Sequence, residues 1–287
     1  MERPPPGGLS AARRAGRACG KEIPEKTLVL QTQPRQGRLQ RPRIGQPQPH
    51  HQAQQFGARL RLAAQQLAPL VPEPGKTICL GLNYFDHAKE GGRDKPDYPW
   101  FFYRGSSSLI AHGAAGVVPK VSSRFDYEAE LAVVIGRRVP RHTPEADALQ
   151  YVFGYSCFND MSVRDYQKRT PQWTIGKNFD QTGAFGPWLV TPDELPSGAH
   201  GLQIQSRLNG NLMQNANTKD FLWGVAETIQ LITECMTLEP GDVVITGTPA
   251  GVGYARTPPV FMKPGDVCEI EIEGIGVLQN SIKDQSL

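Results

Sequence analysis

Three acidic residues have the types and the spacing to bind a divalent cation. Glu128 and Glu130 are two positions apart in the run Arg124-Phe-Asp-Tyr-Glu-Ala-Glu-Leu-Ala-Val-Val-Ile-Gly136, and Asp160 follows further along the chain. The β-branched residues of this run predict a strand, whose alternating side chains turn both glutamates to one face. Clustered carboxylates repel unless a cation lies between them, and such ligands suit Mg²⁺, Mn²⁺ or Ca²⁺ better than Zn²⁺. The alternative is a solvated strand face.

A histidine and a glutamate supply a candidate general base. In Gly81-Leu-Asn-Tyr-Phe-Asp-His-Ala-Lys-Glu90, His87 and Glu90 are three positions apart, so one helical turn places them on the same face. A carboxylate bound to one imidazole nitrogen fixes the tautomer, and the other nitrogen can then accept a proton from water. A surface ion pair is the alternative.

Other residues could stabilise negative charge on a ligand. Lys177 lies beside a glycine and among apolar residues, which suits an oxyanion partner, although a lysine can also extend along the surface into solvent. Arg164 and Gln167 would lie one turn apart on a helix, unless Arg164 pairs with an acid for structural reasons. The glycine-rich run Thr246–Gly253 could offer backbone N–H groups to a carboxylate, but it is neither a Walker loop nor a convincing Rossmann fingerprint.

Composition divides the chain into two regions. Residues 1–72 contain 12 Lys/Arg and 3 Asp/Glu, whereas the rest of the chain contains 19 and 25. We predict that residues 1–71 form a basic low-complexity segment, too poor in apolar residues to build a core, and that residues 72–287 form the catalytic domain. The segment could be a nucleic-acid-binding arm or a transit peptide. We favour a third interpretation, an out-of-frame reading of a GC-rich gene.

Cysteines and apolar runs limit the class of protein. The five cysteines are scattered and form no C-x-x-C pair, which predicts free thiols in a reducing compartment, and we expect the cytoplasm. No apolar run approaches the length of a membrane span, so we expect no membrane partner. A non-catalytic protein that binds nucleic acid through a basic arm would not explain the aligned carboxylates, so we expect no nucleic-acid partner.

The chain after residue 72 alternates short apolar runs with turn residues. Many short strands and few helices predict an α+β or mostly β fold with a mixed sheet. The Asn209-Gly210 pair predicts a tight hairpin turn, and Asp220 is a plausible N-cap for a helix over residues 221–237. We predict strands at residues 76–81, 100–103, 116–119, 124–136, 151–159, 204–208, 242–246, 267–272 and 276–280.

Taken in order, these motifs resemble the fumarylacetoacetate hydrolase family. The resemblance covers roughly residues 72–283, and within the family it is greatest to short acylpyruvate hydrolase and 2-hydroxyhepta-2,4-diene-1,7-dioate isomerase members. It implies a mixed β-roll with few helices, an α+β fold, and a homodimer. The segment before residue 72 does not match the small β-rich domain that bacterial members often carry. The motifs are Gly-x-Asn-Tyr-x-x-His-x-x-Glu, Tyr-Glu-Ala-Glu-Leu, Asn-Asp-x-Ser-x-Arg-Asp-x-Gln, Lys-x-Phe and Thr-Gly-Thr-Pro-x-Gly-Val-Gly.

The resemblance also implies roles for individual residues. The metal is usually Mg²⁺ or Mn²⁺, with Ca²⁺ possible in a crystal, and Asp126 matches none of its ligands. Arg104 and the Arg93-Asp-Lys95 loop are additional candidates for binding a second substrate carboxylate. The implied metal ligands are Glu128, Glu130 and Asp160, the implied catalytic residues are His87, Glu90 and Lys177, and the implied substrate-binding residues are Arg164, Gln167 and Thr248.

We therefore predict a divalent-metal-dependent hydrolase that cleaves the C–C bond of acylpyruvate-type 2,4-diketo acids through an enolate stabilised by the cation. The expected partner is a small 2-oxo acid, in the breakdown of aromatic compounds. The same residues would serve an isomerase or tautomerase of the 2-hydroxyhepta-2,4-diene-1,7-dioate type, or an oxaloacetate-type decarboxylase. The sequence leaves these alternatives open.

Overall fold

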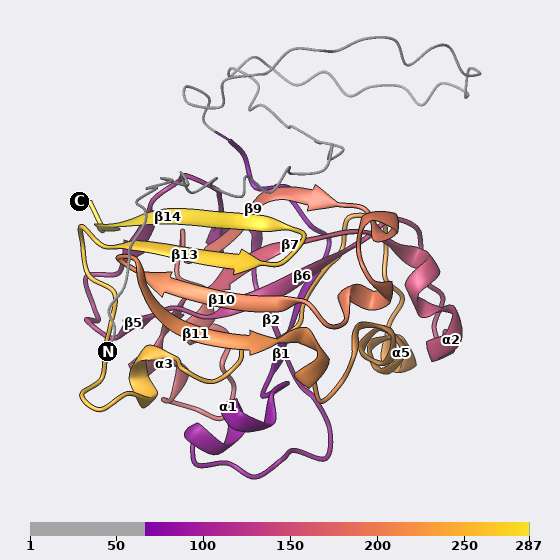
Figure 1. The fold of residues 1–287 in the computed structure, drawn as a ribbon, viewed down its shortest axis with the longest axis horizontal. Helices are drawn as coiled ribbons and strands as arrows, with labels where there is room; N and C mark the ends of the chain where they lie inside the picture. The colour runs from indigo at the N-terminus through magenta and orange to yellow at the C-terminus, as the bar shows by residue number, and fades with distance from the viewer. Residues whose placement is uncertain (1–66, 287) are drawn as a thin grey trace, which may run out of the picture.

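Two β-sheets pack face to face in the computed structural model, which describes residues 67–286 (Figure 1). The larger sheet has the strand order β2-β1-β12-β6-β7-β9-β3, the smaller has β11-β10-β13-β14-β4, and β5 pairs with β8 alone. The strands are β1 Thr77–Gly81, β2 Trp100–Tyr103, β3 Leu109–Ala111, β4 Gly116–Val118, β5 Phe125–Asp126, β6 Ala129–Ile135, β7 Val152–Asp160, β8 Ser162–Val163, β9 Gly183–Val190, β10 Gln203–Leu208, β11 Asn211–Asn217, β12 Val243–Ile245, β13 Val267–Ile272 and β14 Gly276–Asp284.

Helices are short and lie at the ends of the sheets. In Figure 1, α2 and α5 lie side by side at one end, and α1 lies beyond the edge strand β11. The mixed sheets and few helices confirm the predicted α+β class. No helix in residues 67–286 is long and apolar enough to cross a membrane. The α-helices are α1 Phe85–Glu90, α2 Glu145–Ala148, α3 Arg164–Gln167, α4 Thr174–Lys177 and α5 Val225–Cys235.

Strand β6 is buried on both faces and runs through the middle of the larger sheet. Leu131 and Val133 belong to the main core, which includes β10, β13 and β14 of the smaller sheet. Ala132 and Val134 pack on the opposite face with Phe102. Because side chains alternate along a strand, Glu130 lies on the same face as Ala132 and Val134, away from the smaller sheet. The candidate pocket opens on that face.

The strand predicted over residues 124–136 is interrupted between β5 and β6. The Tyr127 N–H donates to Asp126 Oδ1 at 2.9 Å, and the Glu128 N–H donates to Asn159 Oδ1 at 3.0 Å. Side chains therefore replace the strand partners for these two backbone groups. Glu128 lies just before β6 rather than inside a continuous strand.

Helix α5, Val225–Cys235, is shorter than the helix predicted over residues 221–237. It begins at Val225, with Gly224 at the N-cap, and Asp220 instead ends a short 3₁₀ turn. The Leu222 and Trp223 N–H groups bond to Asn83, the former to its carbonyl and the latter to its side-chain Oδ1, both at 2.8 Å. These tertiary hydrogen bonds hold the preceding backbone outside the helix. The predicted segment 1–71 lies outside the described residues, except for residues 67–71.

Candidate active site

Three buried carboxylates converge beside the larger sheet. One oxygen each of Glu128, Glu130 and Asp160 lies within 4.8 Å of the other two. Glu128 precedes β6, Glu130 is on β6, and Asp160 ends the neighbouring strand β7. Asp126, which was not predicted to be a ligand, is not in this group. Antiparallel pairing of β6 and β7 thus brings together acids that are far apart in the sequence.

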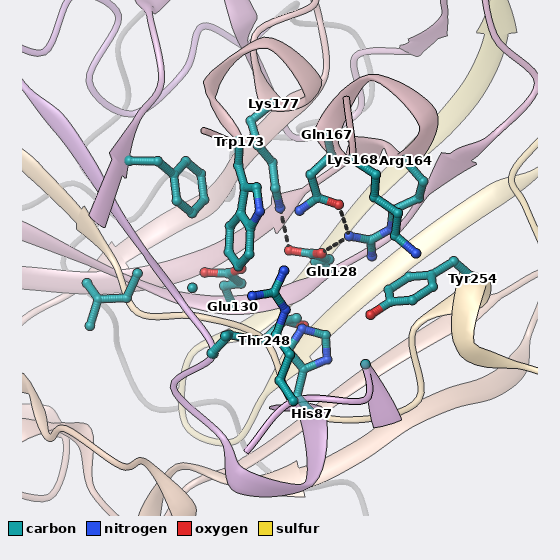
Figure 2. Close-up of a pocket in the computed structure, with 16 residues that line it drawn as sticks. His87, Glu128, Glu130, Arg164, Gln167, Lys168, Trp173, Lys177, Thr248 and Tyr254 are labelled. Carbon is teal, nitrogen blue, oxygen red and sulfur yellow. Dashed lines mark hydrogen bonds and ion pairs between the residues drawn. The ribbon is translucent and has the colours of Figure 1, made fainter. Parts of the chain in front are cut away.

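The charges around these carboxylates are unequal. Lys177 Nζ lies 2.6 Å from Glu128 Oε2, and Arg164 Nη1 lies 2.5 Å from Glu128 Oε1 (Figure 2). Lys177 Nζ also lies 2.5 Å from Asp160 Oδ2. Although burial opposes ionisation, Lys177 and Arg164 hold the pKa of Glu128 well below its usual range. Burial, followed by the neighbouring charges of Asp160 and Glu128, instead raises the pKa of Glu130. The ionised form of Glu130 is therefore disfavoured in this cluster, whereas that of Glu128 is favoured.

This donor set fits a divalent cation. Hard carboxylate oxygens are the ligands that Mg²⁺ and Mn²⁺ prefer, and the repulsion felt by Glu130 would be relieved by a cation between the three groups. Glu128, Glu130 and Asp160 would hold the ion. The predicted ligand set therefore fits a single divalent-cation site.

His87 and Glu90 form a closely bonded pair at the pocket. His87 Nδ1 lies 2.8 Å from Glu90 Oε1, and Glu90 Oε2 accepts a hydrogen bond from the Gly251 N–H at 2.9 Å. Because a carboxylate only accepts, His87 Nδ1 carries the hydrogen in the neutral ring and Nε2 has the free lone pair. The glycine-rich loop thus orients Glu90, which in turn orients His87.

The N–H groups of that loop are engaged by the protein itself. Gly247 donates to Glu130 Oε2 at 2.6 Å and Gly253 donates to Asp126 Oδ1 at 2.8 Å, in addition to the bond from Gly251 to Glu90. The expectation that these N–H groups hold a ligand carboxylate is therefore wrong for these three glycines. They bind protein carboxylates instead and fix the loop against the site.

Arg164 has one donor left over. Its Nε donates to Asp126 Oδ2 at 2.8 Å and its Nη1 donates to Gln167 Oε1 at 2.9 Å. Its Nη2 is buried and has no hydrogen-bond partner among residues 67–286. A buried unpaired guanidinium nitrogen is costly, so such a group marks a position for an acceptor. Arg164 and Gln167 both line the pocket, where a ligand oxygen could satisfy Nη2.

Asp126 connects this arginine to the glycine-rich loop, which the sequence did not indicate. Replacing Asp126 with asparagine is expected to lower the free energy of unfolding by about 3 kcal/mol, because it removes one of the two carboxylates that pair with the buried Arg164 charge. Urea unfolding would measure the loss. The matched control is Glu239→Gln, which breaks the exposed ion pair with Arg138 and should cost less than about 1 kcal/mol. Equal losses would contradict this role.

Arg104 lies behind the metal ligands rather than at the pocket surface. Its Nε contacts Asp160 Oδ1, and its Nη2 donates to the carbonyls of Met161 at 2.7 Å and Thr182 at 3.1 Å. It is buried and does not line the pocket formed by the described residues. This position favours orientation of Asp160 over the predicted contact with a second substrate carboxylate.

The pocket has a volume of about 130 Å³ and combines aromatic walls with cations. Figure 2 shows Lys177, Arg164 and Gln167 on one side of Glu128 and His87 and Thr248 on the other. Trp173 and Tyr254 flank the pocket, and Arg93 and Lys168 also line it. Lys168 and Tyr254 were not predicted from the sequence, since nothing in the local pattern distinguishes either residue from a surface residue.

This site and fold identify the class of protein. The profile described as "Fumarylacetoacetate (FAA) hydrolase C-terminal" matches residues 76–283, and the chain belongs to the fumarylacetoacetate hydrolase family. Its members include hydrolases and isomerases, so the chain is an enzyme of this family. Three relatives give more detail.

A rat protein named "Oxaloacetate tautomerase Fahd2a, mitochondrial" is 40% identical over 78% of this chain and 74% of its own length. The crystal structure of a putative HpcE protein from Mycobacterium smegmatis is 35% identical, covers 78% of this chain and 79% of that chain, and has a TM-score of 0.74. The crystal structure of a 2-hydroxyhepta-2,4-diene-1,7-dioate isomerase from Mycobacterium marinum is 33% identical and has a TM-score of 0.68. The match covers 81% of this chain and 84% of that chain. Isomerases and tautomerases are thus prominent among the similar proteins.

Proposed function

We propose that this enzyme forms the enolate of a short dicarboxylic 2-oxo acid, of the oxaloacetate class, with Mg²⁺ or Mn²⁺, and that it interconverts the keto and enol forms. The observation that carries the proposal is a small pocket where several cations meet His87, Glu128 and Glu130. Asp160 completes the carboxylate cluster beside this pocket, and Glu90 binds His87. The names of the rat tautomerase and the mycobacterial isomerase support proton transfer as the reaction type.

Two exposed cations that line the pocket, Arg93 and Lys168, favour a ligand with a second carboxylate. Arg93 lies over the ring of Trp100, 4.6 Å from its centroid, and 5.8 Å from that of Trp173, so aromatic faces support its guanidinium and leave its edges for an anion. Partial burial and the nearby charges of Arg164, Arg124 and Arg93 lower the pKa of Lys168. Among the described residues, neither Arg93 nor Lys168 has an ion-pair partner, so an anionic ligand would relieve their repulsion.

The pocket volume favours a short ligand. About 130 Å³ is well below the 300–1,000 Å³ typical of pockets for drug-sized molecules. A four-carbon dicarboxylate offers two charged ends, and we expect one to use Arg164 and the other Arg93 and Lys168, which all line this pocket. A seven-carbon dienedioate would have to extend into solvent.

The residues of the site can carry out the proton transfer. His87 Nε2 accepts a proton from the carbon next to the 2-oxo group, and the electron pair left behind delocalises onto the 2-oxo oxygen. When bound, the cation supplies Lewis-acid stabilisation of that negative charge. His87 then returns the proton to the oxygen, which gives the enol. The positive charge of Lys177 beside Glu128 and Asp160 further stabilises the anion.

Hydrolysis of an acylpyruvate is the second candidate, because the His87–Glu90 pair can equally take a proton from water. The hydroxide would attack the 4-oxo carbon, and cleavage of the adjacent C–C bond would leave pyruvate as its enolate. Ultraviolet absorbance with Mg²⁺ or Mn²⁺ separates the candidates on oxaloacetate, an acylpyruvate and a 2-hydroxydienedioate. We expect accelerated enol–keto conversion of oxaloacetate. Pyruvate release from the acylpyruvate without that acceleration would favour the hydrolase, and pyruvate release from oxaloacetate would favour a decarboxylase.

Replacing Arg93 with methionine is expected to raise the KM for oxaloacetate about tenfold, the loss of about 1.4 kcal/mol of binding, with kcat nearly unchanged. The KM for a monocarboxylic acylpyruvate should not change, since it has no second carboxylate. Steady-state kinetics on both substrates test this. Lys89→Met is the matched control, because Lys89 is an exposed cation of α1 that does not line the pocket. Equal effects on both substrates would refute the assignment.

A homodimer and a cytoplasmic location stay predictions. The rat relative is named as mitochondrial, which is a property of that protein. Light scattering of the purified chain and fractionation of its cells of origin would test the two predictions separately.

A further inference from the structure

Gln214, on β11, lies behind the pocket and uses both ends of its side-chain amide. Its Oε1 accepts hydrogen bonds from the Ala129 N–H and the Ser206 hydroxyl, both at 2.9 Å. Its Nε2 donates to Thr248 Oγ1 at 2.7 Å and to the Pro249 carbonyl at 2.8 Å. The side chain is buried, so the amide makes its four hydrogen bonds inside the protein.

The orientation of this amide is fixed by its backbone partners. A backbone N–H can only donate and a carbonyl can only accept, so Oε1 must face Ala129 and Nε2 must face Pro249. Nε2 therefore also donates to Thr248, whose oxygen is the acceptor. The single hydroxyl proton of Thr248 must then point elsewhere.

Thr248 lines the pocket, and Figure 2 shows it near His87 and Glu130. Within residues 67–286 its hydroxyl donates to no protein acceptor. The proton is thus left for an acceptor in the pocket. Ala129 lies between Glu128 and Glu130, so the same amide ties the Thr248 hydroxyl to the backbone that carries two of the carboxylates.

We infer that Gln214 is a positioning residue that sets the polarity of the Thr248 hydroxyl, which donates to an oxygen of the anionic ligand. The inference rests on the proposed function, because it assigns Thr248 to such a ligand. Gln214 touches no ligand and acts through Thr248 alone. Its amide makes Thr248 a donor toward the pocket and holds it at a fixed distance from the carboxylate cluster.

Gln214→Glu tests the polarity directly. The change keeps the acceptor that faces Ala129 and replaces the donor that faces Thr248 with a second acceptor. The Thr248 proton then turns toward the new carboxylate and is lost to the ligand. Isothermal titration of the full-length chain with oxalate, in the presence of Mg²⁺, is expected to show about tenfold weaker binding, or about 1.4 kcal/mol. The affinity for Mg²⁺ alone should be unchanged.

A double-mutant cycle separates this role from a general structural one. Thr248→Val removes the hydroxyl at similar shape and should also weaken oxalate binding about tenfold. In the Thr248→Val background, Gln214→Glu should have no further effect, because the hydroxyl it acts through is gone. The inference would be overturned if the double variant bound oxalate about 100-fold more weakly than wild type, the product of the two single losses. Unchanged oxalate affinity in Gln214→Glu would also overturn it. If circular dichroism shows that Gln214→Glu does not fold, Gln214→Met, which is neutral and similar in size, enters the same cycle.

The double-mutant cycle measures oxalate binding and not turnover, so it tests the role of Gln214 independently of the proposed reaction. A chain that shows the coupling to Thr248 but converts no 2-oxo acid retains the positioning role and overturns the proposed function. A chain that tautomerises oxaloacetate but shows multiplicative losses retains the function and overturns the positioning role.

Discussion

Replacing Glu130 with glutamine is expected to abolish binding of Mg²⁺ or Mn²⁺ while leaving the metal-free protein at least as stable as the wild type. The change removes one of three carboxylates that converge on one point, and the expected loss of metal affinity exceeds about 100-fold. Replacing a group that only orients a metal ligand already lowers metal affinity by roughly 10–100-fold, so the loss of a ligand itself should lower it further. Glutamine keeps an oxygen to accept the Gly247 N–H. Isothermal titration measures the metal, and urea unfolding in EDTA measures the stability.

The pH dependence of stability gives the same prediction a second test. Burial and the charges of Asp160 and Glu128 raise the pKa of Glu130, so the folded metal-free chain binds a proton here more tightly than the unfolded chain. The stability contributed by this group is present below its ordinary pKa and is lost as pH rises through the raised pKa. Glu130→Gln lacks that loss. Its advantage over the wild type in EDTA should therefore grow as pH rises through this window.

Asp160→Asn is the informative comparison, because it should lose both metal and stability. Asp160 contacts Lys177 and Arg104, and both cations are buried. Removing its charge leaves them without this partner, at a cost of about 3–5 kcal/mol. If Asp160→Asn and Glu130→Gln destabilise the metal-free protein equally, the unequal distribution of charge in the cluster is refuted.

Sequence patterns predicted those parts of the site that depend on local geometry. One helical turn places His87 beside Glu90, and strand alternation places Glu130 on the pocket face. Asp160 was proposed as a third ligand from its residue type, but no local pattern connects it to β6, and only the family resemblance implied that role. The partners of Arg104 and Arg164 were not predictable, because a charged residue in a loop gives no sign of which distant acid it meets. Asp126 and Gln214 were missed as positioning residues for the same reason.

The fold was predicted where β-branched residues cluster and missed where glycine and proline interrupt a strand. Strand β9 contains Gly186 and Pro187, which predict a turn. In the structure they lie at the register shift between β7 and β9, where an irregular ladder tolerates a missing N–H. The predicted start of α5 at residue 221 was wrong. Asn83, far away in the sequence, accepts hydrogen bonds from the N–H groups of Leu222 and Trp223, which therefore lie outside the helix.

Replacing His87 with alanine is expected to lower kcat about 10²–10⁴-fold while leaving metal affinity unchanged. His87 is the only residue that we place at the pocket as a base, and its Nδ1 is fixed by Glu90 at 2.8 Å. Alanine removes the base and leaves the three carboxylates in place. Isothermal titration with Mn²⁺ and the oxaloacetate ultraviolet assay measure the two properties separately. His200→Ala, at an exposed histidine outside the pocket, is the control and should behave as wild type.

Glu90→Gln distinguishes orientation from proton transfer. Glutamine can still accept from His87 Nδ1 or from the Gly251 N–H, but it brings a donor to one of these sites and removes the charge that stabilises the protonated ring. Its kcat should therefore fall less than that of His87→Ala, and the double variant should be no slower than His87→Ala alone. Full turnover by His87→Ala would remove the histidine from the mechanism. A double variant much slower than His87→Ala would show instead that Glu90 acts on the substrate by itself.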